Sequence, residues 1–353
     1  MKGIILHGGY GTRLGPLTQI GPKQLIPLAN KPMSQYALDD LTNSGITDVA
    51  IIVGDVFPEK VINFYGDGSK FGTKITYIHQ DKPRGISHAI GLCNEFVGDD
   101  KFVVYLGDNV MRKDLDSFVK KFQNSKNDCM ILLSDVDNPS QFGIAEFNDD
   151  KIIKISEKPQ QSTSNKAVIG IYFLTPKFFN IISILKPSKR GELEITDALQ
   201  LALEQGFLID YDNVSGWWKD TGTPNDILSA TKLILDTMIH DDKIFLSKYT
   251  EKSEGIYVGN NTVIESDCIL QKPIIIGDNC KIKNSKLGPH LCIGNSSEIE
   301  NSNIKNSIIM ENCKIELKQP ISNSIISNET VIYSSKDENH FIVGEKSKIK
   351  LSG

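Results

Sequence analysis

A six-residue repeat of aliphatic side chains in the last third of the chain limits the possible folds more than any other feature. Beyond about residue 255, Val, Ile or Leu recurs at every sixth position, with occasional five-residue steps, and glycine often follows it, as in Ile276-Gly277. Such a hexad is one flat face of a parallel β-helix and three hexads make one coil, whereas a sandwich of short strands would give alternation bounded by irregular turns. The repeat positions are Val258, Ile264, Leu270, Ile276, Ile282, Leu287, Ile293, Ile299, Ile309, Ile315 and Ile321.

The cysteines follow this repeat rather than a ligand pattern. Cys268, Cys280 and Cys313 each stand four residues after an isoleucine that leads a hexad, where other hexads carry Thr or Ser. This predicts small core residues and not metal ligands. Cys93 and Cys129 lie in apolar surroundings, and none of the six cysteines forms a CxxC pair. The sequence therefore predicts reduced thiols, with neither a disulfide framework nor a zinc site.

The first 240 residues alternate strand-like apolar runs with amphipathic stretches, which is typical of a mainly parallel, Rossmann-like sheet covered by helices. A helix is expected after Pro32, ending near Gly45, and another over residues 225–240. Such α/β sheets bind ligands at the carboxyl ends of their strands. The predicted strands are Gly3–Leu6, Val49–Val53, Ile75–Ile78, Phe102–Leu106 and Met130–Leu133.

These two patterns divide the chain. The sequence predicts an α/β domain over residues 1–240, a linker over 241–254, a β-helix over 255–333 and a charged tail over 334–353. The tail is expected either to cap the open end of the β-helix or to be loosely ordered.

Charge and length disfavour several classes of protein. The chain has 353 residues and a formal net charge of −5, with Lys and Arg scattered along it. This disfavours a general binder of nucleic acid or of an anionic membrane. The apolar run Ile4-Ile5-Leu6 is too short for a signal peptide or a membrane span, so a cytoplasmic protein is expected.

A glycine-rich turn follows the first predicted strand. Its sequence is Gly8-Gly9-Tyr10-Gly11-Thr12-Arg13. Glycines let the backbone approach a phosphate closely, and an arginine there can contact anionic oxygens, so the turn indicates polyphosphate binding. Its spacing fits neither GxGxxG nor GxxxxGK[ST], which argues against a dinucleotide-dependent dehydrogenase or a P-loop NTPase. The alternative is a tight turn that merely requires positive φ.

The residues that continue from this turn resemble the sugar-1-phosphate nucleotidylyltransferases. That family opens with the form GGxGTRLxPxT…PKxLxPxxxKPM, and residues 8–18, 22–27 and 30–33 match it in order. The resemblance narrows to glucose-1-phosphate thymidylyltransferases through Leu106-Gly107-Asp108-Asn109, Glu157-Lys158-Pro159, the run RGELEITD over 190–197 and Asp220-Thr221-Gly222-Thr223. Trp217-Trp218 with a hexapeptide tail behind is similar to the long form, which carries a C-terminal left-handed β-helix.

The resemblance implies attack by the phosphate oxygen of glucose-1-phosphate on the α-phosphorus of dTTP or UTP, which gives a nucleotide-sugar and pyrophosphate. Its catalytic residues would be Arg13, which stabilises charge on the reacting phosphorus, Lys23 on the triphosphate and Lys158 on the sugar phosphate. No general base is demanded, because the sugar phosphate is already ionised. Asp108 and Asp220 would bind Mg²⁺, the cofactor implied. Without the resemblance, Asp108 could be a strand-end turn and Asp220 a helix cap.

The resemblance also implies two recognition sets. Gln80 and Gly85 would recognise the pyrimidine edge, with Gln24 near the base or deoxyribose. Tyr172 would contact the hexose, although it could equally be a residue of ordinary strand packing. The nucleotide-binding set is Leu6, Gly8, Gly9, Gly11, Thr12, Arg13, Gln24, Gln80, Gly85 and Asp108. The sugar-phosphate set is Gly143, Glu157, Lys158, Val168, Tyr172 and Arg190.

Three residues depart from the family pattern. His7 and Tyr10 replace the usual small residues, and Phe142 stands where many short forms have tyrosine. They affect base seating and sugar hydrogen bonding and leave the phosphate machinery intact. His88 begins a predicted helix and is expected to have a structural or substrate-rim role.

Other functions remain open at this stage. UTP differs from dTTP by one methyl group, and hexosamine phosphates could replace glucose-1-phosphate. From a different class, the β-helix could be an acyltransferase with His290 as base, although no long loop insertion walls a donor site. A non-catalytic sensor would be expected to have lost Arg13, Lys23, Asp108 or Asp220, and all four are present. The aliphatic β-helix also favours a homo-oligomer.

Overall fold

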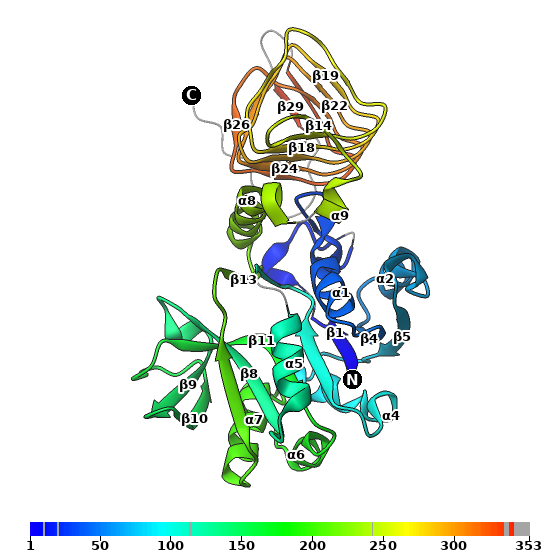
Figure 1. The fold of residues 1–353 in the computed structure, drawn as a ribbon. Coiled ribbons are helices and arrows are strands. Elements are labelled where there is room, and N and C mark those ends of the chain that lie inside the picture. The colour runs from blue at the N-terminus through cyan, green and yellow to red at the C-terminus, as the bar shows by residue number, and fades with distance from the viewer. Residues whose placement is uncertain (10, 20, 113–114, 242, 335–338, 342–353) are drawn as a thin grey trace. The chain divides into compact units, whose positions relative to one another are not determined.

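The computed structural model describes residues 1–9, 11–19, 21–112, 115–241, 243–334 and 339–341 (Figure 1). Contacts between Cα atoms divide the chain into two compact units. Unit 1 comprises residues 1–10, 20–25 and 33–220, and unit 2 comprises residues 11–19, 26–32 and 221–353. Each unit is described below by itself.

Unit 1 is built on one mixed sheet with strand order β10-β9-β11-β6-β1-β4-β5, in which β8 pairs with β11 and β12. Strands β6, β1, β4 and β5 run parallel, and β11 is antiparallel to β6. All five predicted strands are present within two residues of their expected ends. The bounds are β1 Lys2–Leu6, β4 Asp48–Val53, β5 Lys74–His79, β6 Phe102–Leu106, β8 Cys129–Asp135, β9 Gly143–Asn148, β10 Lys151–Glu157, β11 Lys166–Leu174 and β12 Ile209–Asn213, with the short pair β7 Asn109–Met111 and β13 Trp218–Asp220.

Helices cover both faces of this sheet, which explains why its central strands are apolar runs without alternation. Ile4 packs in a core with residues of α3, α6 and α7, and its neighbour Ile5 packs in a second core with residues of α1, α2 and α5. The predicted helix after Pro32 is α1, and Gly45 follows it with φ of +80°. The helices are α1 Met33–Asn43, α2 Pro58–Tyr65, α3 Ile86–Gly91, α4 Asn94–Val97, α5 Asp116–Asn124, α6 Phe178–Ile184 and α7 Ile195–Glu204, with short 3₁₀ turns η2 Lys23–Leu25, η3 Ser69–Phe71 and η4 Pro139–Gln141.

Unit 2 contains the predicted left-handed β-helix, whose coils are stacked in Figure 1. Val258 pairs in parallel with Ile276, Ile276 with Ile293 and Ile293 with Ile309. Successive coils therefore take 18, 17 and 16 residues, which agrees with six-residue steps interrupted by five-residue steps. Its strands form three sheets. The bounds are β14 Thr250–Ser253, β15 Ile256–Val258, β16 Val263–Ile264, β17 Ile269–Leu270, β18 Ile274–Ile276, β19 Lys281–Lys283, β20 Lys286–Leu287, β21 Leu291–Ile293, β22 Glu298–Glu300, β23 Asn303–Lys305, β24 Ser307–Ile309, β25 Lys314–Glu316, β26 Ile321–Ser322, β27 Ile325–Ile326, β28 Val331–Ser334 and β29 Asn339–Phe341.

The repeat positions and the cysteines fill the interior of the β-helix. Ile276, Ile282 and Ile293 are buried, as are Cys280 and Cys313, and Cys268 packs against them half-buried. Cys93 and Cys129 are buried in unit 1, and all six thiols are free. The predicted place of Cys280 and Cys313 in the core of the β-helix is confirmed.

Antiparallel strands cover the ends of two β-helix sheets. At the first coil β14 pairs with β15, and at the last coil β29 pairs with β28. An added strand satisfies backbone groups that an open edge would leave unpaired. The described part of the tail therefore caps the β-helix, and residues 335–338 and 342–353 of the predicted tail lie outside the described residues.

The compact units are not divided where the sequence places its domain boundaries. Helix α8 (Pro224–Asp241) belongs to unit 2, as do the segments that contain η1 (Thr12–Leu14), β2 (Pro27–Leu28) and β3 (Lys31–Pro32). Strand β2 packs against α8, and the Asn30 side chain donates a hydrogen bond of 2.7 Å to the Ile293 carbonyl. The expected linker over 241–254 contains α9 (Lys243–Leu246) and β14. No helix in the described ranges is long and apolar enough to span a membrane.

Candidate active site

Lys23 and Asp108 form the charged centre of the candidate site in unit 1. Asp108 lies in the turn between β6 and β7, at the carboxyl end of a central strand, and Lys23 lies on η2. The Lys23 Nζ atom is 2.5 Å from Asp108 Oδ2, and only 8% of the surface of Lys23 is exposed. Burial raises the pKa of Asp108, but the ammonium of Lys23 and hydrogen bonds from Lys23 and Asn109 outweigh it and hold this pKa below its usual range. The Asp108 carboxylate is therefore ionised at neutral pH.

Asn109 holds this centre in place, a role that its sequence context did not predict. Its amide nitrogen donates to Asp108 Oδ1 at 2.9 Å, while its Oδ1 atom accepts from the Gly170 N–H at 3.2 Å and from the Trp218 indole at 2.7 Å. Asn109 is 3% exposed. The sequence carried one signal for this role: Asn109 directly follows the candidate ligand Asp108 at the end of a strand. An amide buried there must find hydrogen-bond partners.

Asp220 is brought to the same edge of the sheet by strand pairing. In the antiparallel pair of β13 and β7, Asp220 lies opposite Asn109, the neighbour of Asp108. The alternative role of Asp220 as a helix cap does not hold, because Thr223 and Asp226 cap α8. The Asp226 carboxylate accepts from the Thr223 N–H at 3.0 Å, and Thr223 Oγ1 accepts from the Asp226 N–H at 3.3 Å.

Asp108 and Asp220 suit a magnesium ion better than a metal held by protein alone. The described residues contain no group of three His, Cys, Asp or Glu side chains that could hold a metal ion. Mg²⁺ commonly takes one or two carboxylates together with substrate phosphates and waters. Two carboxylates at one sheet edge are therefore a donor set that fits Mg²⁺ in the presence of a triphosphate.

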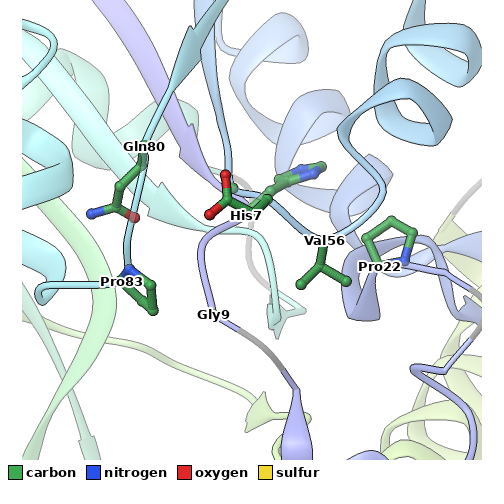
Figure 2. Close-up of a pocket in the computed structure, with 8 residues that line it drawn as sticks. His7, Gly9, Pro22, Val56, Gln80 and Pro83 are labelled. Atoms are coloured by element: carbon green, nitrogen blue, oxygen red, sulfur yellow. The ribbon is translucent and has the colours of Figure 1, made fainter.

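A small pocket lies beside the glycine turn in unit 1 (Figure 2). Gln80 and Pro83 lie on one side of the Gly9 backbone, and Val56 and Pro22 lie on the other (Figure 2). Gln80 follows β5 and is 4% exposed, and its Nε2 atom donates to His88 Nδ1 at 2.9 Å. A buried amide with one donor already fixed is a suitable group to recognise a base.

Glycine leaves room for the Gln80 amide at position 8 and for the Leu193 backbone at position 85. A Cβ atom at Gly8 would lie 2.9 Å from Gln80 Oε1. At Gly85, where φ is +102°, a Cβ atom would lie 2.5 Å from the Leu193 carbonyl oxygen. The backbone of Leu193 bonds to this loop twice, through its N–H to the Arg84 carbonyl and through its own carbonyl to the Ser87 N–H. Gly8 and Gly85 thus each have a steric reason in this chain.

His7 is buried in the floor of this pocket. Its side chain is 5% exposed, its ring lies edge-on to Tyr65, and neither ring nitrogen has a hydrogen-bond partner among the described residues. Burial lowers the pKa of His7 to about 3, although the charge of Asp108 acts in the opposite direction. The imidazole is therefore neutral near pH 7. Tyr10, the other departure in this turn, lies outside the described residues.

Two further nucleotide-set residues are buried in unit 1. Leu6 ends β1 and is 7% exposed. Gln24, on η2, is 2% exposed, and its amide donates to the Gly8 carbonyl at 3.4 Å. Gln24 therefore contacts the glycine turn in this structure.

The predicted sugar residues gather around Glu157 at the end of β10. Thr196 Oγ1 donates to Glu157 Oε2 at 3.1 Å, and Lys158 Nζ lies 3.6 Å from Glu157 Oε1. Arg190 Nη1 lies 3.8 Å from the same oxygen. A Cβ atom at Gly143 would lie 2.4 Å from Thr196 Cγ2, so glycine leaves room for this arrangement. The cluster combines two cations with a carboxylate that can accept hydrogen bonds from hydroxyl groups.

Val168 and Tyr172 differ from the rest of the sugar set. Both lie on β11, both are less than 10% exposed, and both belong to the core that contains Ile4. Burial, followed by the charges of Glu157 and Asp108, raises the pKa of Tyr172. Phe142 packs edge-on against Trp218, with ring centroids 5.6 Å apart. The position of Tyr172 favours strand packing, the alternative interpretation of its sequence.

The second half of the glycine turn belongs to unit 2. Gly11 has φ of +58° and precedes η1, which carries the exposed residues Thr12 and Arg13. The Arg13 guanidinium lies against Gly222, where a Cβ atom would be 3.1 Å from Arg13 Nη2. Gly9 also has positive φ, of +102°. This backbone is compatible with a phosphate-binding turn and with a tight turn that merely requires positive φ.

Comparison with known proteins agrees with this geometry. The family described as nucleotidyl transferase matches residues 2–237. The chain is 41% identical to the low-salt glycan biosynthesis nucleotidyltransferase Agl11 of Haloferax volcanii, over 99% of this chain and 100% of that protein. It is 36% identical to a glucose-1-phosphate thymidylyltransferase of Streptomyces antibioticus, over 99% of both chains.

A solved structure agrees as well. A glucose-1-phosphate thymidylyltransferase from Bacillus anthracis, crystallised with sucrose, superimposes with a TM-score of 0.63 at 45% identity, over 66% of this chain and 94% of that one. The family match over the α/β part and the two full-length relatives lead to one conclusion: this chain is a sugar-1-phosphate nucleotidyltransferase of the nucleotidyl transferase family.

Proposed function

We propose that the chain is a glucose-1-phosphate thymidylyltransferase that converts glucose-1-phosphate and dTTP into dTDP-glucose and pyrophosphate. The observation that carries the nucleotide assignment is the buried amide of Gln80 in the pocket beside Gly9. An amide presents a donor next to an acceptor, which matches the imide edge of thymine or uracil. The thymidylyltransferases among the relatives support the choice of thymine.

The reaction joins two anions, so the site must neutralise charge and align the groups. An oxygen of the sugar phosphate forms a bond to the α-phosphorus, and the bond from that phosphorus to the departing pyrophosphate breaks. Lys23 would hold triphosphate oxygens, and Arg13 would stabilise charge on the reacting phosphorus and the leaving group. Lys158 and Arg190 would hold the sugar phosphate. No side chain has to remove a proton, because a phosphate monoester is ionised near pH 7.

Asp108 and Asp220 would hold Mg²⁺ together with the triphosphate. When bound, the ion neutralises phosphate charge and favours departure of pyrophosphate. Lys23 would have a second role besides holding the triphosphate, because its ammonium neutralises Asp108 when no metal is present.

Acyl transfer by the β-helix is less well supported. His290 Nε2 lies 2.6 Å from Asp236 Oδ1 on α8, and the His290 side chain is 17% exposed. The His290 ring joins the β-helix to a helix of its own unit. This arrangement supports a structural role.

The test is pyrophosphate release with Mg²⁺ and glucose-1-phosphate, comparing kcat/KM for dTTP, UTP, CTP, GTP and ATP. A preference for dTTP supports the proposal, and Asp108→Asn should lower kcat by at least ~10²-fold. If UTP equals or exceeds dTTP, the enzyme is a uridylyltransferase or uses both nucleotides. If no nucleotide reacts with glucose-1-phosphate but one reacts with glucosamine-1-phosphate, the sugar assignment is wrong. Consumption of an acetyl donor would support the β-helix activity instead.

A further inference from the structure

We infer that His88 is a positioning residue for pyrimidine selectivity, because its Nδ1 atom fixes the Gln80 amide in the orientation that accepts an imide and rejects cytosine. The inference rests on the proposed pyrimidine site and names the group that decides its selectivity. The sequence analysis gave His88 only a structural or rim role.

The Gln80 amide is held through its nitrogen, and its oxygen lies close to the Gly8 backbone. Its Nε2 atom lies 2.9 Å from His88 Nδ1, and its Oε1 atom lies against Gly8, where no side chain intervenes. An amide nitrogen only donates, so Nδ1 must accept, and the ring proton must be on His88 Nε2. The contact therefore requires a neutral imidazole in one tautomer.

This orientation determines which base edge can pair with the amide. One N–H of Gln80 is used by His88, which leaves the second N–H as a donor and Oε1 as an acceptor. Thymine and uracil offer a carbonyl acceptor beside an N–H donor, which is the complementary arrangement. Cytosine offers an amino donor beside a ring-nitrogen acceptor. Its donor would therefore face the amide N–H, and its acceptor would face Oε1. A rotation of the amide by 180° would reverse this preference.

The first turn of α3, which carries His88, is itself fixed. The Ser87 N–H donates to the Leu193 carbonyl, and Ser87 Oγ donates to the Glu194 carbonyl at 3.1 Å. Helix α3 packs against α6, α7 and β1. The His88 imidazole therefore has a fixed position and can orient the Gln80 amide.

Burial and the Arg84 charge keep the His88 ring neutral at pH 7. The charged groups that act on it are Arg84 and Asp81, in the loop that precedes α3. Burial, and then the Arg84 guanidinium, lower the pKa of His88 below its usual value of 6.5, against the smaller opposing effect of Asp81. Protonation at Nδ1 would convert the acceptor into a donor, which would then attract Gln80 Oε1.

Three variants of the full-length chain test the inference. His88→Leu removes the acceptor, His88→Asn restores one because its Oδ1 takes a place near that of Nδ1, and His79→Asn makes the same change in a neighbouring ring that pairs with Asp55 instead. The readout is the ratio of kcat/KM for dTTP to that for CTP. We expect His88→Leu to lower this ratio by at least ~10-fold. The ratio should stay within about threefold of the wild type in His88→Asn and His79→Asn.

A pH series on the wild type gives a second test that does not depend on His88→Leu folding. The ratio should fall as the pH is lowered through a pKa below 6.5, and His88→Asn should show no such fall. If the wild type prefers dTTP but His88→Leu keeps the ratio, the positioning role is wrong and the proposed function stands. The same holds if the ratio does not change at any acidic pH at which the protein stays folded. If the wild type does not prefer dTTP or UTP over CTP, the proposed function and this inference both fail.

Discussion

The ammonium of Lys23 lies 2.5 Å from the carboxylate of Asp108, a proposed magnesium ligand, so the protein without substrate already carries a cation at this position. A metal ion must compete with this ammonium for Asp108. In Lys23→Met the competitor is absent while most of the length of the side chain is kept. We expect the affinity for Mn²⁺, a spectroscopic substitute for Mg²⁺, to rise by about tenfold in the absence of nucleotide.

The same variant should lose catalysis, because the triphosphate loses its ammonium partner. Mn²⁺ binding is measured by electron paramagnetic resonance and activity by pyrophosphate release. Lys158→Met removes a cation that contacts Glu157 rather than Asp108, and should leave Mn²⁺ binding unchanged. Equal Mn²⁺ affinities in wild type and Lys23→Met would show that Lys23 and the metal do not share Asp108.

Gly222→Ala should impair catalysis without unfolding the protein. The added Cβ would lie 3.1 Å from the Arg13 guanidinium, the mobile end of a flexible side chain, so Arg13 is displaced and the backbone is not. We expect kcat to fall by about 10-fold or more, since a misplaced charge stabilises the transition state poorly. Gly21→Ala is the control, because its Cβ would have no neighbour nearer than 4.0 Å. Unchanged kcat in Gly222→Ala would argue against a catalytic position for Arg13.

The buried His7 should make the protein less stable in acid. Its pKa is about 3 in the folded state and near 6.5 when unfolded, so below pH 6.5 the unfolded chain takes up a proton that the folded chain does not. Stability is thus lost as the pH falls from 6.5 towards 3, by about 1.4 kcal/mol for each pH unit.

Urea unfolding of wild type and His7→Gln at pH 7 and pH 4 measures this contribution. Relative to the variant, the free energy of unfolding of the wild type should drop by about 3 kcal/mol between the two pH values. A difference between the two proteins that is the same at both pH values would mean that His7 titrates normally in the folded state.

Gly143→Ala should weaken sugar-phosphate binding selectively. Its Cβ would lie 2.4 Å from Thr196 Cγ2, so Thr196 must move and its hydrogen bond to Glu157 is lost. We expect KM for glucose-1-phosphate to rise by about tenfold, while KM for dTTP stays near its wild-type value. Initial-rate measurements with each substrate varied separately distinguish the two. A rise in KM for dTTP alone would place Gly143 at the nucleotide instead.

Several parts of the fold could be predicted from sequence periodicity alone. The strands around Ile4 and Val104 are continuous apolar runs because both faces of the sheet are buried, and such runs are recognisable without any contact information. The antiparallel strands β9 and β10 were not predicted, since half-exposed strands such as Lys151–Glu157 carry a weaker signal. The assignment of α8 to a domain also escaped prediction, because its packing against β2 joins residues about 200 positions apart in the sequence.

Periodicity and motif spacing are local properties of a chain, so the β-helix, the α/β sheet and the residue types of the candidate site could be predicted without a structure. Which of those residues meet depends on the folded chain. Lys23 with Asp108, Gln80 with His88 and Asp220 opposite Asn109 are pairs formed by chain crossings and strand register. Tertiary structure also gave Asn109 and His88 their partners, since the hydrogen bonds of a buried amide or imidazole depend on which atoms folding brings within about 3 Å.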